Sequence, residues 1–166
     1  NDTYKSYKLG SNETNTYFVE YEEGIYVGYR YWETRGYEED DNWAWYNNNV
    51  TYTFGTGLSY TTFDWEIQNS STPAGAITAD KTIKFDVKVT NTGDVAGKDV
   101  VELFYTAPYI EGEIEKSYVE LGGFAKTKLL EPNESQVVTI ELKVEDMASY
   151  DYNDANTNDN CGYELD

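Results

Sequence analysis

Histidine is absent from the 166-residue sequence, and cysteine occurs once, as Cys161. Without imidazole the chain has no catalytic triad of the Ser-His-Asp type and no histidine ligand for a metal ion. One cysteine excludes a disulfide within the chain. No apolar run approaches the roughly 20 residues of a membrane-spanning helix. The opening segment, NDTYKSYKLG, lacks the charged-then-apolar layout of a signal peptide, so any targeting signal of a secreted parent would lie outside this sequence.

Basic residues are scarce. Twelve Lys and Arg face thirty-one Asp and Glu, which gives a net charge of −19. A surface of this sign repels the phosphate backbone of nucleic acids and the headgroups of anionic membranes. We therefore expect no nucleic acid among the partners and no membrane insertion, and the charge itself mainly favours solubility.

Tyrosine is the abundant residue, with 17 copies beside four tryptophans. Aromatic and β-branched residues favour strands, and the many asparagines favour turns. A chain of this length can bury one hydrophobic core and still carry an extension, without a disulfide or metal to stabilise it.

Strict alternation of apolar and polar residues begins at Lys81, where TIKFDVKVT places every second side chain on one face. Such alternation predicts a half-buried antiparallel strand. Similar patterns predict strands over 98–107, 118–124 and 136–144, with a turn at 91–94. Short strands separated by turns are typical of a β-sandwich. The predicted core comprises Ile83, Phe85, Val87, Val89, Val101, Leu103, Val138, Ile140 and Leu142.

The first 60 residues are less regular. We expect a loop over 1–16, then one or two short strands over the aromatic-rich 17–34, broken at Gly24. An acidic and asparagine-rich loop should follow over 35–49, and a strand should start near Thr61. No segment has a convincing helical period, although one helical turn fits within 144–151. Residues 68–80 read as a loop and 161–165 as a final strand.

Four segments resemble sequences of a known family, in the family's order. They are YEEGIYVGYRY at 21–31, FGTGLSYTTF at 54–63, VTNTGDVAG at 89–97 and LGGFAKT at 121–127. Each is similar to a motif in the C-terminal region of family 3 glycoside hydrolases. Any one match would be weak, but four in order, each at a predicted strand or turn, carry the resemblance.

The resemblance implies an all-β fold, an immunoglobulin/fibronectin type III-like β-sandwich over 63–166. It implies that 1–62 is the tail of a preceding α/β-sandwich domain with a linker. Residues 17–62 are too few, and too interrupted by glycine and polar loops, to bury a core of their own, so we expect them to pack on the sandwich. The expected partners are the catalytic TIM-barrel and α/β-sandwich domains of a parent enzyme. The family's last strand is not found before Asp166, so we expect an open sheet edge that another segment must cover.

The family's members are β-glucosidases, β-xylosidases and related retaining enzymes, which need two carboxyls about 5–5.5 Å apart. In the family these carboxyls lie in domains that precede the matched segments, and neither motif is found here. We therefore expect no catalytic residue in this chain, and an extracellular or cell-surface location only through the parent. The acidic run Glu38, Glu39, Asp40 and Asp41 is interpreted as a solvated surface rather than a catalytic pair.

Two tryptophans, Trp43 and Trp45, are candidates for carbohydrate contact. On an extended segment residues i and i+2 face the same side, so the two indoles could form a platform for a sugar. The alternative is that the indoles anchor the loop onto the domain. Arg30, between Tyr29 and Tyr31, is expected to hold a carboxylate between domains or to stack on an aromatic ring.

A calcium site is the one cofactor hypothesis that the sequence offers. Asp154, Asn156 and Asn158 reproduce the D-x-N-x-N start of a calcium loop. Asp159 replaces the required glycine, and Glu164 lies one position short of the required glutamate, so a plain polar loop is the alternative.

Three functions remain open from the sequence. The first is a non-catalytic accessory region that supports the catalytic domains of a family 3 exo-β-glycosidase. The second is a carbohydrate-binding module that uses the two tryptophans. The third is a surface adhesion module that shares only the sandwich, since a fold does not fix a function.

Overall fold

Antiparallel strands make up most of the regular secondary structure in the described residues, with two short helices inserted before the third strand. The computed structural model describes residues 4–8, 15–19, 23–39, 42–71, 77–159 and 161–165. Its elements are β1 (Tyr4–Lys8), β2 (Asn15–Val19), α1 (Tyr29–Glu39), α2 (Ala44–Asn49), β3 (Phe63–Ser71), β4 (Thr82–Asn91), β5 (Val100–Tyr105), β6 (Glu120–Lys126), β7 (Ser135–Lys143), the 3-10 helix η1 (Val144–Met147), β8 (Ser149–Asp151) and β9 (Gly162–Glu164).

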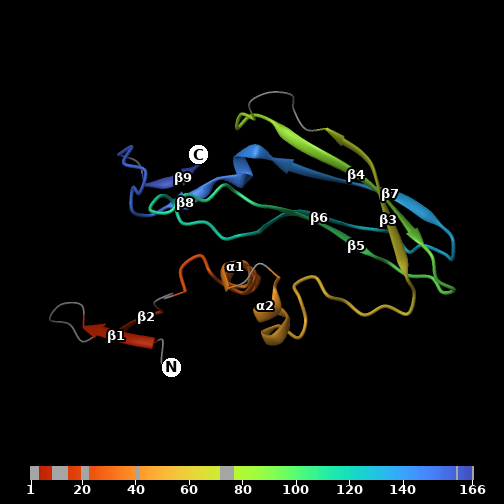
Figure 1. Ribbon diagram of the computed structural model, residues 1–166, viewed down its shortest axis with the longest axis horizontal. Coiled ribbons are helices and arrows are strands. Elements are labelled where there is room, and N and C mark those ends of the chain that lie inside the picture. The colour runs from red at the N-terminus through yellow and green to blue at the C-terminus, as the bar shows by residue number, and fades with distance from the viewer. Residues whose placement is uncertain are drawn as a thin grey trace.

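Two sheets face each other and enclose the core. One has the strand order β3-β4-β7, the other contains β5 and β6, and all pairs are antiparallel. In Figure 1 the β3-β4-β7 sheet lies on one side, the β5-β6 pair is in the middle, and α1 and α2 lie on the far side of that pair. The all-β sandwich predicted from the alternating pattern is confirmed.

The buried core matches the predicted inward positions. Seven of the nine predicted residues are buried, and Phe85 and Leu103 are half-buried. The pairing explains why, because Val87 lies opposite Val138 and Phe85 opposite Ile140, so inward residues of β4 and β7 share one face. The pattern missed two fully buried residues, Ile114 and Leu130, because both lie outside the named strands where alternation gives no signal.

Asn91 connects three segments at one end of the sandwich. Its side chain is fully buried and accepts hydrogen bonds from Thr61 Oγ1 (2.6 Å) and the Gly93 amide (3.1 Å). Its Nδ2 donates to the carbonyls of Val95 (2.8 Å) and Leu130 (2.9 Å). The amide side chain therefore satisfies its hydrogen-bonding capacity inside the protein, which is how a buried polar group avoids a desolvation cost.

The extension before β3 differs from the prediction. The strands expected within 17–34 and the loop expected over 35–49 are wrong where α1 and α2 form, although β2 begins this region as a strand. Tertiary packing overrides the β-propensity of the aromatic residues here. Gly36 faces Tyr46, where an added Cβ would approach Tyr46 Cβ to 2.9 Å, so the absence of a side chain lets the helices meet. Among the described residues, neither helix is long and apolar enough to cross a membrane.

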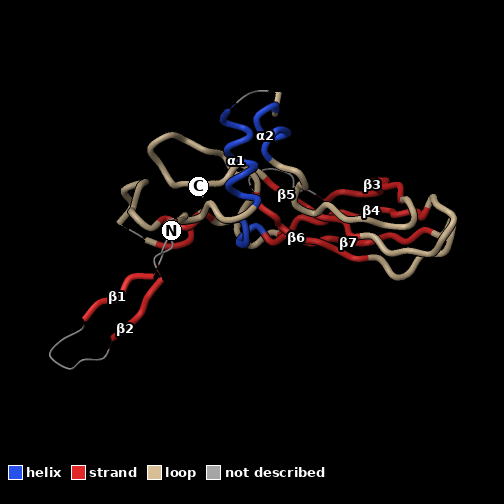
Figure 2. The backbone as a smooth tube through the Cα atoms, turned by 90° about the horizontal axis from the view of Figure 1, so that it is seen from below, coloured by secondary structure: helices blue, strands red, loops and turns tan. Residues whose placement is uncertain are grey.

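Two of the predicted loops are partly wrong, and two predictions for the C-terminal part of the chain are confirmed. The loop predicted over 1–16 is wrong at β1 and at the start of β2, which pair as a hairpin that projects away from the sandwich in Figure 2. The loop predicted over 68–80 is wrong at its start, because β3 continues to Ser71. The helical turn within 144–151 and the final strand within 161–165 are confirmed as η1 and β9.

Candidate functional site

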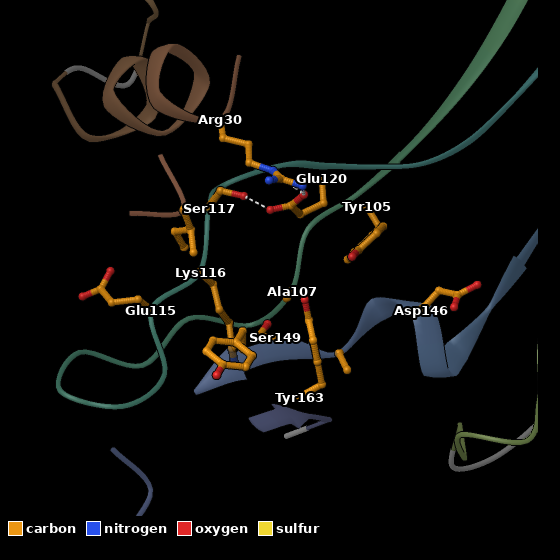
Figure 3. A pocket seen from close by; sticks show the side chains of 13 residues that line it. Arg30, Tyr105, Ala107, Glu115, Lys116, Ser117, Glu120, Asp146, Ser149 and Tyr163 are labelled. Atoms are coloured by element: carbon orange, nitrogen blue, oxygen red, sulfur yellow. Dashed lines mark hydrogen bonds and ion pairs between the residues drawn. The ribbon is translucent and has the colours of Figure 1, made fainter. Parts of the chain in front are cut away.

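A cavity of about 240 Å³ lies where the extension meets the sandwich. Its walls come from the start of α1, the end of β5, the segment before β6, and the β8-β9 hairpin. Figure 3 shows Arg30 and Glu120 at one side and Asp146 and Tyr163 at the other. Its lining brings together charged residues that lie far apart in the sequence, among them Arg30, Glu120 and Asp146, so it is the first candidate for a site.

Arg30 and Glu120 form the centre of this arrangement. Arg30 Nε donates to Glu120 Oε2 at 2.7 Å, and its NH2 group lies 2.6 Å from the same oxygen. Ser117 Oγ donates to the other carboxylate oxygen at 2.5 Å. Burial lowers the pKa of Arg30, but the neighbouring Glu120 carboxylate raises that pKa by more, so the guanidinium stays charged. The expectation that Arg30 holds a carboxylate is confirmed.

Tyrosines near the cavity are held in their neutral form. Tyr26 donates its hydroxyl hydrogen to Glu115 Oε2 at 2.6 Å, and burial together with this carboxylate raises the pKa of Tyr26 well above its usual range. Burial, followed by Glu120, also raises the pKa of Tyr105. Lys116, which is buried, donates to the Pro108 carbonyl at 2.7 Å. Tyr26 and Lys116 thus act as hydrogen-bond donors beside the cavity.

The charged groups of the cavity hold the extension against the sandwich; we call the Arg30–Glu120 pair, with Ser117, the clamp. Both oxygens of Glu120 and one of Glu115 already bind side chains of this chain. A retaining glycosidase needs one carboxyl free to attack and a second poised to give up a proton. Glu120 joins α1 to β6 instead, and Glu115 joins the segment before α1 to the segment before β6.

Further contacts join α1 to β6 and to the segment before β6. We call the boundary between these elements, which includes the Arg30–Glu120 and Tyr26–Glu115 pairs, the seam. The Leu121 amide donates to the Tyr29 hydroxyl at 2.9 Å, and the Tyr118 amide donates to Thr34 Oγ1 at 2.9 Å. Tyr37 stacks on Tyr118 with ring centroids 4.2 Å apart. Of the residues 17–62 that were expected to pack on the sandwich, those of α1 do so, whereas the β1-β2 hairpin projects away from it (Figure 2).

The two candidate tryptophans point in different directions. Trp43 immediately precedes α2 and packs against Tyr46 and Tyr118, with centroids 5.4 and 5.6 Å away. Trp45, inside α2, stacks on Trp32 at 5.9 Å and lies under the Arg35 guanidinium. The extended segment assumed for a shared platform is wrong because α2 is helical. Trp43 anchors the extension, and sugar contact at either tryptophan stays a prediction.

The other side of α1 presents apolar side chains to solvent. Val27 is 56% exposed, Trp32 39% and Tyr31 37%. A shallow groove runs between these residues, with Glu23 and Tyr26 completing its lining. Contiguous exposed aromatic surface is typical of an interaction site.

The proposed calcium residues lie in a loop with internal hydrogen bonds. Asp154 Oδ1 accepts the Asn158 amide at 2.9 Å, and both Asn156 and Asn158 donate side-chain hydrogens to Glu164, at 2.7 and 2.6 Å. Within the described residues no group of three or more Asp, Glu, His or Cys is arranged to hold a metal ion. Asn156 and Asn158 share Glu164 as their partner, and calcium binding stays a prediction.

The acidic run is split by the end of α1. Glu38 and Glu39 belong to this helix, and Glu39 pairs with Arg35 at 2.8 Å. Asp40 and Asp41 lie outside the described residues. The residues that sequence reasoning missed are Glu115, Ser117 and Glu120, which lie on an irregular segment and at the start of β6, where no spacing marks them.

Comparison with known proteins shows where such a chain occurs. Residues 99–161 match the fibronectin type III-like domain family. The chain is 48% identical over 153 residues to β-glucosidase A of Butyrivibrio fibrisolvens, covering 86% of this chain and 17% of that protein. It is 39% identical over 131 residues to a β-glucosidase of Ruminococcus albus, covering 79% of this chain and 12% of that one.

Solved structures give the same result. A β-glucosidase from Paenibacillus barengoltzii superposes with a TM-score of 0.71 at 43% identity, covering 86% of this chain and 14% of the other. β-Glucosidase 3B of Thermotoga neapolitana, solved with α-D-glucose, superposes with a TM-score of 0.62 at 41% identity, covering 80% and 16%. The chain thus spans less than a fifth of the length of these relatives.

The resemblance to the C-terminal region of family 3 glycoside hydrolases is confirmed by these matches. The chain carries a fibronectin type III-like β-sandwich of the kind found within β-glucosidases.

Proposed function

We propose that this chain is a non-catalytic accessory region of a family 3 exo-β-glycosidase, in which it supports the catalytic TIM-barrel and α/β-sandwich domains. The observation that carries the proposal is the seam between α1 and β6, where the carboxylates of Glu115 and Glu120 hold the extension onto the sandwich. Contacts of this kind fix the position of α1 and the segment before it relative to β6.

The extension is the part that connects to the catalytic domains in this proposal. Its inner face is bound to the sandwich, while its outer face exposes Val27, Tyr31 and Trp32 around a groove. Residues 1–62 belong, by their resemblance, to the tail of the α/β-sandwich domain and a linker. The outer face of α1 would then pack on the remainder of that domain. The chain would share the location of its parent enzyme, which we propose to be extracellular or at the cell surface.

The absence of activity in the isolated chain is the first test. The purified 166-residue protein should not hydrolyse p-nitrophenyl β-D-glucoside or p-nitrophenyl β-D-xyloside. Turnover that survives repurification and is lost in Glu115→Gln or Glu120→Gln would overturn the proposal, because those carboxylates would then be reacting groups.

The supporting role is tested in the full polypeptide that contains this chain. Trp32→Ala should make the glycosidase activity of that polypeptide less resistant to heat, since it removes an aromatic side chain from the proposed contact. Tyr60→Phe, at a fully exposed position that does not line the groove, serves as the control. Equal heat inactivation of the two variants and the parent would contradict the proposed contact.

A carbohydrate-binding role is the second candidate, favoured by the stacked pair of Trp32 and Trp45 beside exposed Tyr31. Aromatic rings exposed in this way can stack on the apolar faces of sugar rings. Pull-down of the isolated chain on insoluble cellulose or xylan distinguishes the candidates. Retention that Trp32→Ala abolishes would favour sugar binding, whereas no retention leaves the supporting role.

A further inference from the structure

The cavity beside the clamp contains hydroxyl groups that the fold itself does not use. Tyr105, Ser149 and Tyr163 line it, and among the described residues none of these three side chains has a hydrogen-bond partner. In Figure 3 the hydroxyls of Tyr105 and Tyr163 point into the space between the clamp and the β8-β9 hairpin. Three groups that can each donate and accept a hydrogen bond are therefore available to a bound molecule.

These hydroxyls come from three strands that converge at the cavity. Tyr105 ends β5 and lies directly opposite Glu120 of the clamp. Burial, followed by the Glu120 carboxylate, raises the pKa of Tyr105, so its hydroxyl keeps its hydrogen at neutral pH. Ser149 begins β8, and the next residue, Tyr150, pairs with Tyr163 of β9. The two tyrosine rings meet edge to face with centroids 5.1 Å apart, so this wall is aromatic as well as polar.

The charged groups of the lining already have partners within the chain. Arg30 and Glu120 neutralise each other, and Glu115 accepts a tyrosine hydroxyl hydrogen. Lys116 donates to a backbone carbonyl at 2.7 Å. In Figure 3 the carboxylate of Asp146 points away from the clamp. An anionic ligand would need an unpaired cation in the lining, so a neutral molecule that carries hydroxyl groups fits this chemistry better.

The volume of the cavity limits the size of such a molecule. Its 240 Å³ is far more than one water molecule needs, yet it is below the roughly 300 Å³ at which pockets for drug-sized ligands begin. A single sugar ring has this size, with hydroxyls around its edge and C–H groups on its faces. The hydroxyls match Tyr105 and Ser149, and the faces match the tyrosine rings of the β8-β9 hairpin.

We propose that this cavity binds one neutral, polyhydroxylated molecule of the size of a monosaccharide, held by Tyr105, Ser149 and Tyr163. The molecule bridges the clamp, the end of β5 and the β8-β9 hairpin, so its binding stabilises the seam. The site is separate from Trp32 and Trp45, neither of which lines the cavity. It lies entirely within this chain, so it does not depend on the proposed accessory function.

Binding of D-glucose to the 166-residue protein tests the site. Titration followed by NMR should shift the amide resonances of β8 and of the end of β5, and the shifts should saturate. At a glucose concentration about ten times the Kd, the Tm should rise by about 3–6 °C, and amide exchange in α1 and β8 should slow. Sugars that are merely excluded from a protein surface raise the Tm without saturation. A rise of that kind with no saturable shift would overturn the proposal, as would no response.

Matched variants make the test specific. Tyr105→Phe and Ser149→Ala should each weaken glucose binding about threefold to tenfold, because each removes one hydrogen bond to the ligand. Neither hydroxyl has a partner within the described residues, so both variants should fold normally. Tyr60→Phe, at a fully exposed position outside the cavity, should bind like the wild type. Unchanged binding in both cavity variants would overturn the proposal. So would tighter binding of D-glucosamine than of D-glucose, which would show that the cavity selects a cation.

Discussion

The sandwich and the helical extension follow different rules, although they share one chain and one aromatic-rich composition. In the sandwich, inward residues recur at every second position of β4 and β7, and the same residues are buried. In the extension, the aromatic residues of 17–34 suggested strands, but α1 forms and its aromatic side chains bind the segment before β6. Local pattern decides structure where strands pair with each other, and tertiary contact decides it where a short segment must fit an existing surface.

The largest expected effect is a charge placed in the sandwich core. Val87→Asp should abolish cooperative folding, with a loss of more than about 4 kcal/mol, because the side chain is 6% exposed and has no partner for a carboxylate. Chemical denaturation followed by circular dichroism measures this.

The control for the core variant lies on the outward face of the neighbouring strand. Val137→Asp, 52% exposed, should change the free energy of unfolding by about 0.5 kcal/mol or less. A cooperative melt of Val87→Asp near the wild-type temperature would mean that the strand register is wrong by one residue.

The next effect concerns the buried amide at the end of the sandwich. Asn91→Ala should cost about 2–4 kcal/mol, because it leaves the carbonyls of Val95 and Leu130 without their side-chain donor. Asn69→Ala, at an exposed position of β3, is the control and should cost about 0.5 kcal/mol or less. Similar losses for both variants would show that the hydrogen bonds of Asn91 add nothing beyond a generic strand position.

The sequence predicted the sandwich better than the site for a physical reason. Alternation reports which face of a strand is buried, so Val87, Val89 and Ile140 could be placed before any coordinates. The clamp joins Arg30 to Glu120 across 90 positions, and no local period links two such residues. Arg30 was singled out by its aromatic neighbours, but its partner could only be found once α1 was placed against β6.

A third variant tests whether the extension is helical as described. Gly36→Ala should destabilise the contact between α1 and α2 by about 1–3 kcal/mol, because the new Cβ would lie 2.9 Å from Tyr46 Cβ. Helix propensity alone would stabilise the variant by about 1 kcal/mol. The sign of the change in the free energy of unfolding therefore shows whether packing or propensity dominates at this position. Hydrogen exchange should accelerate in α1 and α2 while β4 is unaffected.

The matched control for Gly36→Ala is Glu38→Ala, an exposed position of the same helix. It should change the rate of exchange in α1 by less than about twofold, because an exposed substitution changes the free energy by no more than about 0.5 kcal/mol. A neutral or stabilising effect of Gly36→Ala would contradict the close approach of the two helices. It would then support the loop and strands that the sequence predicted for this part of the extension.

The smallest effect is a pH dependence carried by the seam. Burial, followed by the Glu115 carboxylate, raises the pKa of Tyr26 above its ordinary value of about 10. The folded extension therefore holds a proton that the unfolded chain releases, so this contribution is complete below about pH 10 and is lost as the pH rises through the folded-state pKa. Tyr26→Phe removes the titrating group and costs about 0.5–1.5 kcal/mol at neutral pH through the lost hydrogen bond. Its thermal stability should then fall less steeply than that of the wild type above pH 10, whereas Tyr152→Phe, at a 71% exposed position, should follow the wild type. Parallel curves for the Tyr26 variant and the wild type in alkali would show that the hydroxyl–carboxylate contact does not stabilise the seam.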